Sequence, residues 1–447
     1  MNWRKTMYFA AHRATGGNMP LIYNRFVRED HRKSHNDIAR ERLSRILDHS
    51  ATAVPYYREL FAARGLTPQG DPLAILPQLP ILTKDLIRAH RDTLTSRDLS
   101  RRKWGYSATG GSTGEPLQLI QDKDFDEQVV ALQMLYSTWT GTVVGDRQVS
   151  LWGVEREILH GSVGTAVILA NKLTNRILLN AYRMPPQKMR QYLNIINTWR
   201  PRLIVAYAQA IYELACFAER EGIAVRRQRA IIATAGTLYP FIRQKVEQVF
   251  GCPVYNRYGS REVGDIAGEC DHHQGLHVLP WGSYVEIVDE SGAPVPPGVE
   301  GRLLVTCLTN YAMPLLRYDI GDRGALAPAD ERCPCGRAGQ RLASLAGRSV
   351  DTFRTRDGTL IGGSYFIHQL FYRQWVKKFQ IVQRSTSEVL YRIVANGQSG
   401  PPAELEEITA GTRAVMGPEC VVSFEFVDDI PLLASGKYRY TVSLVTA

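Results

Sequence analysis

An alternation of short apolar runs with helical patterns, between residues 149 and 258, constrains the fold most. The runs have the length and composition of buried strands, and they are VSLW (149–152), AVILA (166–170), LIVAY (203–207) and AIIA (230–233). The helical pattern after the last run begins at Pro240 and ends at Gly251, where helices prefer these residue types. Strands that alternate with helices predict an α/β fold with largely parallel pairing.

Chain length and a change of pattern predict two domains. The chain has 447 residues, more than one compact core usually holds. Beyond residue 348, short apolar runs at 379–383, 390–394 and 421–427 surround one helical pattern near 402–415. We therefore expect a large α/β domain of layered sheets and helices over residues 1–347. A small α+β domain should follow over residues 348–447, which is an ordinary domain size.

Composition favours a globular protein of the cytoplasm. Hydrophobic residues make up 44% of the chain and charged residues 22%, close to the average for such proteins. No run reaches the roughly 18 apolar residues of a membrane span, and the first residues lack the apolar stretch of a secretory signal. The seven cysteines are few and odd in number, so no disulfide framework is expected. We expect no membrane partner, and a homodimer stays open as the oligomeric state.

The net charge allows two classes of partner. The chain has 54 basic and 44 acidic residues, a formal charge of +10. A basic surface attracts nucleic acids, but it equally attracts phosphorylated small molecules. No zinc-finger spacing, basic-zipper region or aromatic RNA-binding signature accompanies the charge. A small-molecule partner without nucleic acid is the expectation, and a nucleic-acid-binding protein is the rival that steep salt dependence would favour.

A glycine-rich segment, YSATGGSTGEPL at residues 106–117, has the residue types of an anion-binding loop. Glycines let the backbone turn tightly so that amide groups point inward, and the hydroxyl groups add donors. The segment differs from the Walker phosphate loop, which needs lysine after its last glycine, because Glu115 follows Gly114. A flexible polar turn is the alternative for such a segment taken alone.

Three further segments carry polar residues next to expected strands. In VYNRYGSREVG (254–264), Tyr258 can stack on a base and Glu262 can hold magnesium on phosphates. In LLRYDIGDRG (315–324), Asp319 and Asp322 are expected in a turn after a strand, where an aspartate can accept ribose hydroxyls, and turn capping is the alternative. In ASGKYRY (434–440), Lys437 lies in a glycine turn near the end of the chain. Each residue alone has an ordinary structural explanation.

These segments, in this order, resemble those of the acyl-adenylate-forming ligases. The chain is most similar to the phenylacetate–coenzyme A ligase branch and its capsule-biosynthesis relatives. The resemblance extends from about residue 56 to residue 440, and it rests on TGGSTGEP, YGSREVG, RYDIGD, GR followed by Asp351, and SGK at 435–437. It implies a large nucleotide-binding domain and a mobile C-terminal lid.

The resemblance also implies roles for individual residues. Lys437 and Glu262 would be catalytic, with Glu262 assisting magnesium, and Asp322 would hold the ribose. Arg348 would precede a hinge at Val350 or Asp351. The remaining nucleotide-binding residues would be Thr109, Ser112, Thr113, Gly114, Ala235, Gly236, Thr237, Tyr258, Gly259, Ser260 and Arg261.

The implied activity is ATP-dependent activation of a carboxylic acid through an acyl adenylate, followed by transfer to coenzyme A. Joining a carboxylate to a phosphate requires cations and backbone donors where charge develops. Alternatives are transfer to an amine or to a carrier-protein thiol, and a nucleotide-binding relative without activity. The branch implies an aryl or small apolar acid. Candidates for its pocket are Trp139, Trp152, Tyr207 and Ala208.

A separate group of cysteines and histidines predicts a zinc site. Cys270 is followed by His273 and His277, and Cys333 and Cys335 lie further along the chain. Sulfur and nitrogen donors of this kind bind zinc tetrahedrally, and unpaired thiols in loops are the alternative. The resemblance favours His277 over His273 as the ligand. Four protein donors would leave no open position, which predicts a structural zinc.

Overall fold

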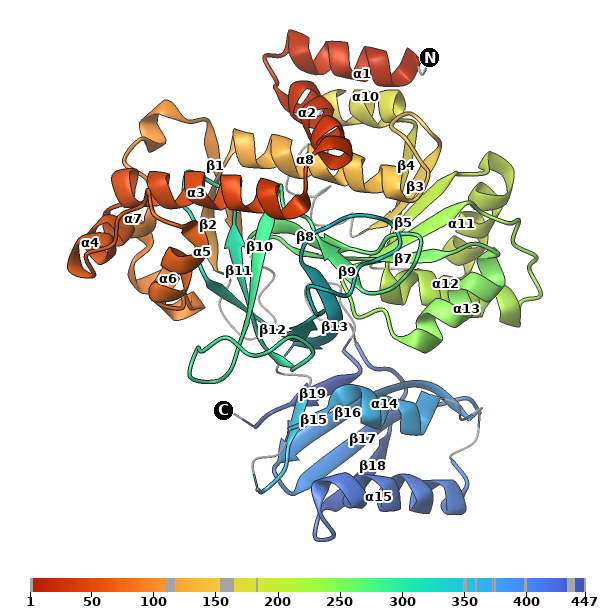
Figure 1. The fold of residues 1–447 in the computed structure, drawn as a ribbon. Coiled ribbons are helices and arrows are strands. Elements are labelled where there is room, and N and C mark those ends of the chain that lie inside the picture. Colours follow the sequence, from red (N-terminus) through yellow and green to blue (C-terminus); the bar gives the residue numbers. More distant parts are fainter. Residues whose placement is uncertain are drawn as a thin grey trace. The chain divides into compact units, whose positions relative to one another are not determined.

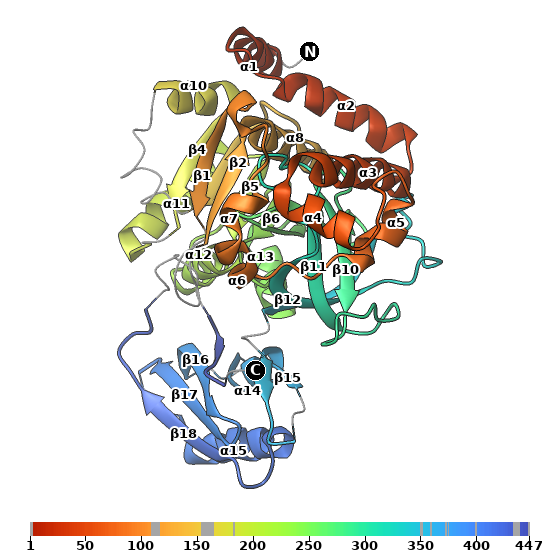
Figure 2. The same cartoon turned by 90° about the vertical axis from the view of Figure 1, so that its left-hand side faces the viewer.

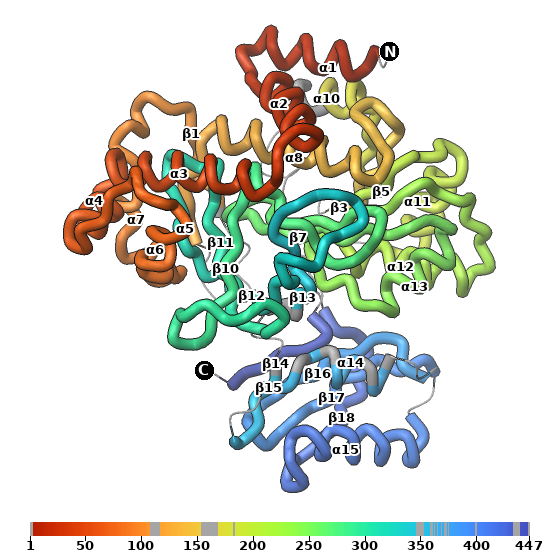
Figure 3. The backbone as a smooth tube through the Cα atoms, in the orientation of Figure 1, coloured from red at the N-terminus to blue at the C-terminus, as the bar shows by residue number. Residues whose placement is uncertain are grey.

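The structure of the protein is a computed structural model. It describes residues 3–108, 117–152, 165–181, 184–348, 352–357, 360–371, 373, 375–397, 400–431 and 439–445. The chain forms two compact units, residues 1–320 with 324–345 and residues 321–323 with 346–447. The domain boundary between residues 347 and 348 stays a prediction. Figures 1 and 3 trace both units along the chain.

An eleven-stranded sheet, in the order β10-β11-β12-β13-β9-β8-β7-β6-β5-β3-β4, forms the centre of the larger unit. Its parallel half consists of β3 (Gln148–Trp152), β4 (Arg176–Asn180), β5 (Leu203–Tyr207), β6 (Ala230–Thr234) and β7 (Val254–Ser260). The other half consists of β8 (Gly264–Gly268), β9 (Leu276–Val278), β10 (Ser283–Val288), β11 (Gly301–Cys307), β12 (Tyr318–Leu326) and β13 (Arg341–Arg348). Strand β7 joins the halves, because it is parallel to β6 and antiparallel to β8.

The predicted parallel α/β pattern is confirmed, with one error in its elements. The runs at 149–152, 203–207 and 230–233 lie in β3, β5 and β6. The run at 166–170 belongs instead to helix α10 (Thr165–Thr174), and the strand that pairs with β3 is β4. Periodicity cannot separate a short apolar helix from a buried strand, which explains this error.

Helices cover the sheet and form a layer at the amino-terminal end of the chain. Those nearest the parallel strands are α8 (Lys123–Trp139), α11 (Pro186–Trp199), α12 (Ala208–Arg220) and α13 (Pro240–Phe250). In Figures 1 and 2, α11, α12 and α13 lie together beside these strands. The amino-terminal helices are α1 (Trp3–Ala14), α2 (Met19–Arg32), α3 (His35–Ala53), α4 (Pro55–Ala63), α5 (Pro72–Ile75), α6 (Lys84–Ala89) and α7 (Arg91–Leu94). Strands β1 (Trp104–Ala108) and β2 (Gln118–Asp122) form an antiparallel pair. In the described residues, no helix is both long and apolar enough to cross a membrane.

Helix α8 packs tightly on the face of the sheet formed by β7 and β8. Tyr136 of α8 is completely buried. Its hydroxyl donates to the backbone oxygens of Asn256 and Glu269, each at 3.1 Å, so the ring is fixed at both strands. Gly268 of β8 lies directly below this ring, because a Cβ at that position would be 2.2 Å from Tyr136 Cε2. The close contact requires glycine.

The smaller unit is an α+β fold. Its four-stranded sheet has the order β18-β17-β16-β19, and β14 pairs with β15 beside it. The elements are β14 (Thr352–Arg354), β15 (Leu360–Gly362), α14 (Gly363–Phe371), β16 (Val376–Ser385), β17 (Glu388–Ala395), α15 (Pro402–Met416), β18 (Val421–Phe426) and β19 (Thr441–Ser443). The predicted strands and helix of this region lie within these elements. The predicted fold class, a large layered α/β part with a small α+β part, is confirmed.

We predict that Gly268→Ala lowers the free energy of unfolding by about 1–3 kcal/mol, the usual cost of overfilling a packed core. Tyr136 cannot move away without breaking its two hydrogen bonds. Denaturant titration measures the effect. Gly105→Ala is the matched control, because a Cβ at Gly105 meets no atom within 4 Å. Equal stability of the two variants would contradict the packing argument.

Candidate functional site

Two of the predicted nucleotide-binding segments leave the sheet at the same edge. Strands β6 and β7 are parallel neighbours, with Ile231 opposite Val254 and Ala233 opposite Asn256. Residues 235–237 and 258–261 therefore emerge side by side at the carboxyl ends of these strands. In open α/β sheets, ligands bind at this edge. The structure thus brings together two segments that are separated by about twenty residues in the sequence.

The segment after β6 has the geometry of a tight turn. Ala235 adopts a left-handed backbone conformation with φ of 59°, which is uncommon for a residue with a side chain. Gly236 is exposed, and a Cβ on it would lie 3.8 Å from the Cβ of Ala208, where α12 begins. The carboxyl ends of β5 and β6 are therefore close enough to border one ligand.

The segment at the end of β7 contains a β-bulge between Tyr258 and Gly259. Tyr258 is half-buried and packs against the core. A Cβ on Gly259 would lie 2.7 Å from the backbone oxygen of Gly264, so no side chain fits there. The hydroxyl of Ser260 is buried and has no hydrogen-bond partner within the part of the chain that the structure describes. A buried hydroxyl without a partner at this edge is available to a ligand.

Glu262 lies in the turn between β7 and β8 and is 7% exposed. Its Oε1 accepts from the Tyr318 hydroxyl at 3.4 Å. The side-chain amide of Gln121, on β2, donates to the backbone oxygens of Arg261 and Glu262, at 2.7 and 3.4 Å. The turn is held from two directions, so the carboxylate of Glu262 has a defined position.

The two aspartates of the third segment lie on β12 and differ in their surroundings. Asp319 accepts from the Arg302 guanidinium at 2.5 Å and is therefore engaged in an ion pair. Asp322 is half-buried. The ribose-binding role of Asp322 stays a prediction.

Several predicted site residues lie outside the described residues. They are Thr109, Ser112, Thr113, Gly114 and Lys437, together with Val350 and Asp351 of the expected hinge. Arg348 is the last residue of β13, and only its backbone is described. The roles of all these residues stay predictions.

Four parallel strands present a row of side chains at their carboxyl ends, on the face that α8 covers. Strand registers place Trp152, Tyr207, Thr234 and Arg257 in this carboxyl-edge row. The rings of Trp152 and Tyr207 are in contact, with centroids 4.6 Å apart. Sequence reasoning did not select Arg257. A charge within a buried strand was the signal that could have identified it.

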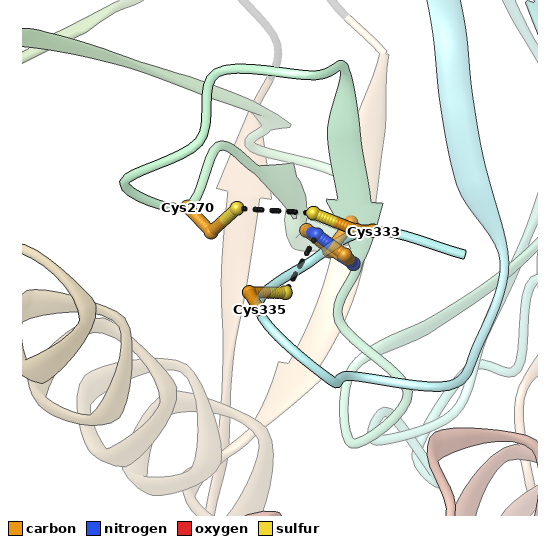
Figure 4. A group of neighbouring side chains, drawn as sticks. Cys270, Cys333 and Cys335 are labelled. Atoms are coloured by element: carbon orange, nitrogen blue, oxygen red, sulfur yellow. Dashed lines mark hydrogen bonds between the residues drawn. The ribbon is translucent and has the colours of Figure 1, made fainter. Parts of the chain in front are cut away.

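The predicted zinc ligands come together from three segments of the chain. Cys270 follows β8, His277 lies on β9, and Cys333 and Cys335 lie between β12 and β13. Their donor atoms all lie within 4.8 Å of one another. The distance is 3.6 Å between the sulfurs of Cys270 and Cys333 and 3.4 Å from Cys335 Sγ to His277 Nε2. Figure 4 shows the three thiols pointing toward one another.

The donor set fits a tetrahedral zinc ion. Sulfurs about 2.3 Å from such an ion are about 3.8 Å apart, close to the separation of Cys270 and Cys333. Burial, together with the charges of His35, Arg337 and Arg341, lowers the pKa of His277 to about 4, so its imidazole is neutral and can ligate. The His277 Nδ1 atom is buried, and no described residue forms a hydrogen bond with it.

His273 has a different set of contacts. Its Nδ1 lies 3.1 Å from Glu269 Oε2 and 3.2 Å from an Arg243 nitrogen. It is not a member of the donor cluster. The geometry therefore favours His277 over His273 as the fourth ligand, in agreement with the expectation from the resemblance.

A buried polar cluster connects the zinc ligands to the amino-terminal helices. Asp30 of α2 accepts from His35 at 2.9 Å and from the Trp139 indole at 3.2 Å. The Arg337 guanidinium lies 3.5 Å from Asp30 and 4.1 Å from the centre of a Trp139 ring. The Trp139 and His277 rings are 6.1 Å apart. Trp139, a candidate for the acid pocket, thus lies beside the predicted zinc ligands.

Comparisons with known proteins agree with the predicted resemblance. The family model of the CapK C-terminal domain matches residues 353–443. Protein CapK of Staphylococcus aureus is 24% identical over 396 residues, which cover 87% of this chain and 84% of that protein. The phenylacetate–coenzyme A ligase of Thermus thermophilus is 28% identical over 332 residues, which cover 70% of this chain and 69% of that protein.

A solved structure shares the fold. The crystal structure of 2-hydroxyisobutyryl-CoA ligase, in the postadenylation state with 2-HIB-AMP, superposes with a TM-score of 0.69 at 18% identity. The match covers 91% of this chain and 88% of that chain. These comparisons confirm the predicted resemblance to the acyl-adenylate-forming ligases and to their phenylacetate–coenzyme A ligase branch.

We predict that the purified protein holds about one zinc ion per chain and that a strong chelator lowers its unfolding temperature, because a ligand of the folded state stabilises it. His277→Ala should remove most of the metal, as measured by elemental analysis. His273→Ala is the matched control and should keep it. A folded protein without metal, or equal metal content in both variants, would contradict the assignment.

Proposed function

We propose that the protein is an AMP-forming ligase that activates a carboxylic acid with ATP and transfers the acyl group to coenzyme A. The observation that carries this proposal is the adjacent position of residues 235–237 and 258–261 at the carboxyl edge of β6 and β7. The sequence similarity to phenylacetate–coenzyme A ligases extends over 70% of the chain and supports the same activity.

The residues at this edge suit the first half-reaction. A carboxylate oxygen attacks the α-phosphate of ATP, the acyl adenylate forms, and pyrophosphate leaves. Tyr258 would flank the adenine together with residues 235–237, and Gly259 would let the backbone approach the nucleotide. Magnesium, when bound, neutralises phosphate charge, and the fixed carboxylate of Glu262 is the proposed residue for holding it. Asp322 would accept the ribose hydroxyls.

We propose that the Cys270, His277, Cys333 and Cys335 site holds a structural zinc. Four protein donors leave no coordination position for a substrate. The ion would instead connect the loop after β8 with the loop between β12 and β13. The free state of all seven cysteines supports a reducing compartment, and we propose the cytoplasm.

The proposal also concerns two specific points, the acceptor of the acyl group and the identity of the carboxylic acid. Transfer to an amine or to a carrier-protein thiol is the alternative second half-reaction. Product analysis with coenzyme A and, separately, with amino acids distinguishes thioester from amide. The branch implies an aryl or small apolar acid. We propose no nucleic-acid partner, and a homodimer stays a prediction. Screening carboxylic acids by pyrophosphate release tests the first half-reaction directly.

We predict that Glu262→Gln lowers the rate of pyrophosphate release by about 10²–10³ at limiting magnesium, because it removes a charge placed for the transition state. The fold should persist, as circular dichroism would show. Glu286→Gln is the control, because the Glu286 side chain is 12% exposed and pairs with Arg317 at 3.1 Å. It should lose stability and keep its magnesium dependence. Unchanged magnesium dependence in Glu262→Gln would exclude Glu262 from the site.

Lys437→Ala should separate the two half-reactions. We expect adenylation to fall by at least about 10²-fold, because the lysine would neutralise the developing phosphate charge. Conversion of a supplied acyl adenylate to the thioester should stay near normal. Both rates are measured on one preparation, with Lys377→Ala as an exposed-lysine control. Equal loss in both half-reactions, or no loss of adenylation, would contradict the proposed role.

A further inference from the structure

A buried charged pair lies beside the proposed nucleotide site and is incompletely hydrogen-bonded. Arg257 of β7 and Asp265 of β8 are each 7% exposed. Arg257 Nε lies 3.6 Å from Asp265 Oδ1, which is longer than a hydrogen bond. Arg257 Nε and Asp265 Oδ2 are both buried and have no hydrogen-bond partner among the described residues. The pair therefore presents one unused donor and one unused acceptor.

Another charged pair in the larger unit, Arg317 with Glu286, has a much more complete set of hydrogen bonds. Arg317 is 4% exposed, and its Nε donates to both carboxylate oxygens of Glu286, at 3.1 and 3.3 Å. Its other nitrogens donate to the backbone oxygens of Pro77, Leu79 and Gly292. This pair has a structural role. The Arg257 and Asp265 pair lacks such a set of partners.

The position of the pair connects it with a ligand. Arg257 belongs to the carboxyl-edge row, on the same face as the Trp152 and Tyr207 rings. It directly precedes Tyr258, whose side chain lies on the opposite face of β7. Arg257 is thus next to the proposed adenine contact, Tyr258, in the sequence. Asp265 lies across the β-bulge from Gly259, the residue that follows Tyr258.

The energetic cost of the arrangement requires an explanation. A buried polar group without a partner costs about 1–3 kcal/mol, and a charged group costs more. Natural proteins leave few such groups, and those that occur require a functional reason or a bound molecule. A ligand that supplies an acceptor to Arg257 and a donor to Asp265 would recover this free energy on binding.

We propose that Arg257 and Asp265 recognise a hydroxyl group on the carboxylic acid substrate. A hydroxyl oxygen can accept from Arg257 Nε while its proton is donated to Asp265 Oδ2. An apolar acid satisfies neither atom, and an amine satisfies only the aspartate. The Trp152 and Tyr207 rings on the same face suit the apolar body of the acid. The inference rests on the proposed function and names the substrate class within it.

The test uses pairs of acids that differ by one hydroxyl group. Suitable pairs are phenylacetate with 4-hydroxyphenylacetate, benzoate with 3- and 4-hydroxybenzoate, and butyrate with 3-hydroxybutyrate. 4-Aminobenzoate is the amine probe. The kcat/KM for pyrophosphate release is measured for each acid with the full-length protein. We expect at least one hydroxylated acid to exceed its unsubstituted partner by about 10-fold or more, because sites that bind a hydroxyl reject analogues without it.

Two variants test whether the preference for hydroxylated acids depends on Arg257 and Asp265. Arg257→Met combined with Asp265→Leu should lower the hydroxyl preference at least about 10-fold, mainly by losing activity on the hydroxylated acid. Its unfolding temperature should be equal or higher, because replacing an unsatisfied buried ion pair with apolar groups is often neutral or stabilising. Asp265→Asn alone, which is nearly the same size as aspartate, should give a smaller loss of preference.

Arg317→Met is the matched control. It should lower the unfolding temperature, because Glu286 and three carbonyl groups lose their donor, and it should keep the hydroxyl preference. A preference for the unsubstituted acids or for 4-aminobenzoate would overturn the inference. So would a hydroxyl preference that both pair variants keep. Pyrophosphate release with no acid of the panel would overturn the proposed function and this inference together, whereas release without hydroxyl preference would overturn the inference alone.

Discussion

The change of pairing at β7 is the constraint on which the candidate site depends. This strand is parallel to β6 on one side and antiparallel to β8 on the other. The parallel partner places residues 235–237 beside its carboxyl end. The antiparallel partner returns the chain at once, so Glu262 lies in a short turn at the same edge. A sheet that was parallel throughout would need a long crossover there and would carry the acid away.

The cluster of predicted zinc ligands lies at the other half of the same sheet. Its ligands come from the segment after β8, from β9 and from the loop before β13, which are distant in sequence and adjacent in the fold. Burial alone would raise the pKa of Asp30, but hydrogen bonding to His35 and the charge of Arg337 lower it, so the carboxylate stays ionised between α2 and this loop. An ion in the cluster would therefore hold the strands and the amino-terminal helices in one arrangement.

Sequence patterns predicted the architecture better than they predicted the site. The strands at 149–152, 203–207 and 230–233 were identifiable because they are short, apolar and bounded by helices. The run at 166–170 was not, because a ten-residue apolar helix has no distinguishing periodicity. The cluster of Cys270, His277, Cys333 and Cys335 was predictable from residue type, since cysteine is scarce here. Arg257 and Asp265 were not, because their importance depends on missing partners, which appear only once the strands are paired.

Arg257 and Tyr258, just before the bulge, belong to opposite faces of a single strand. Neighbouring side chains on a strand point to opposite faces, so in the proposed function Tyr258 would contact the nucleotide and Arg257 the acid, although they are adjacent in sequence. Substitution of Arg257 and its partner Asp265 would then leave the proposed nucleotide contact in place. Substitutions at positions 257 and 265 alone would then change which acid is bound, and the activation of the acid by ATP would be retained.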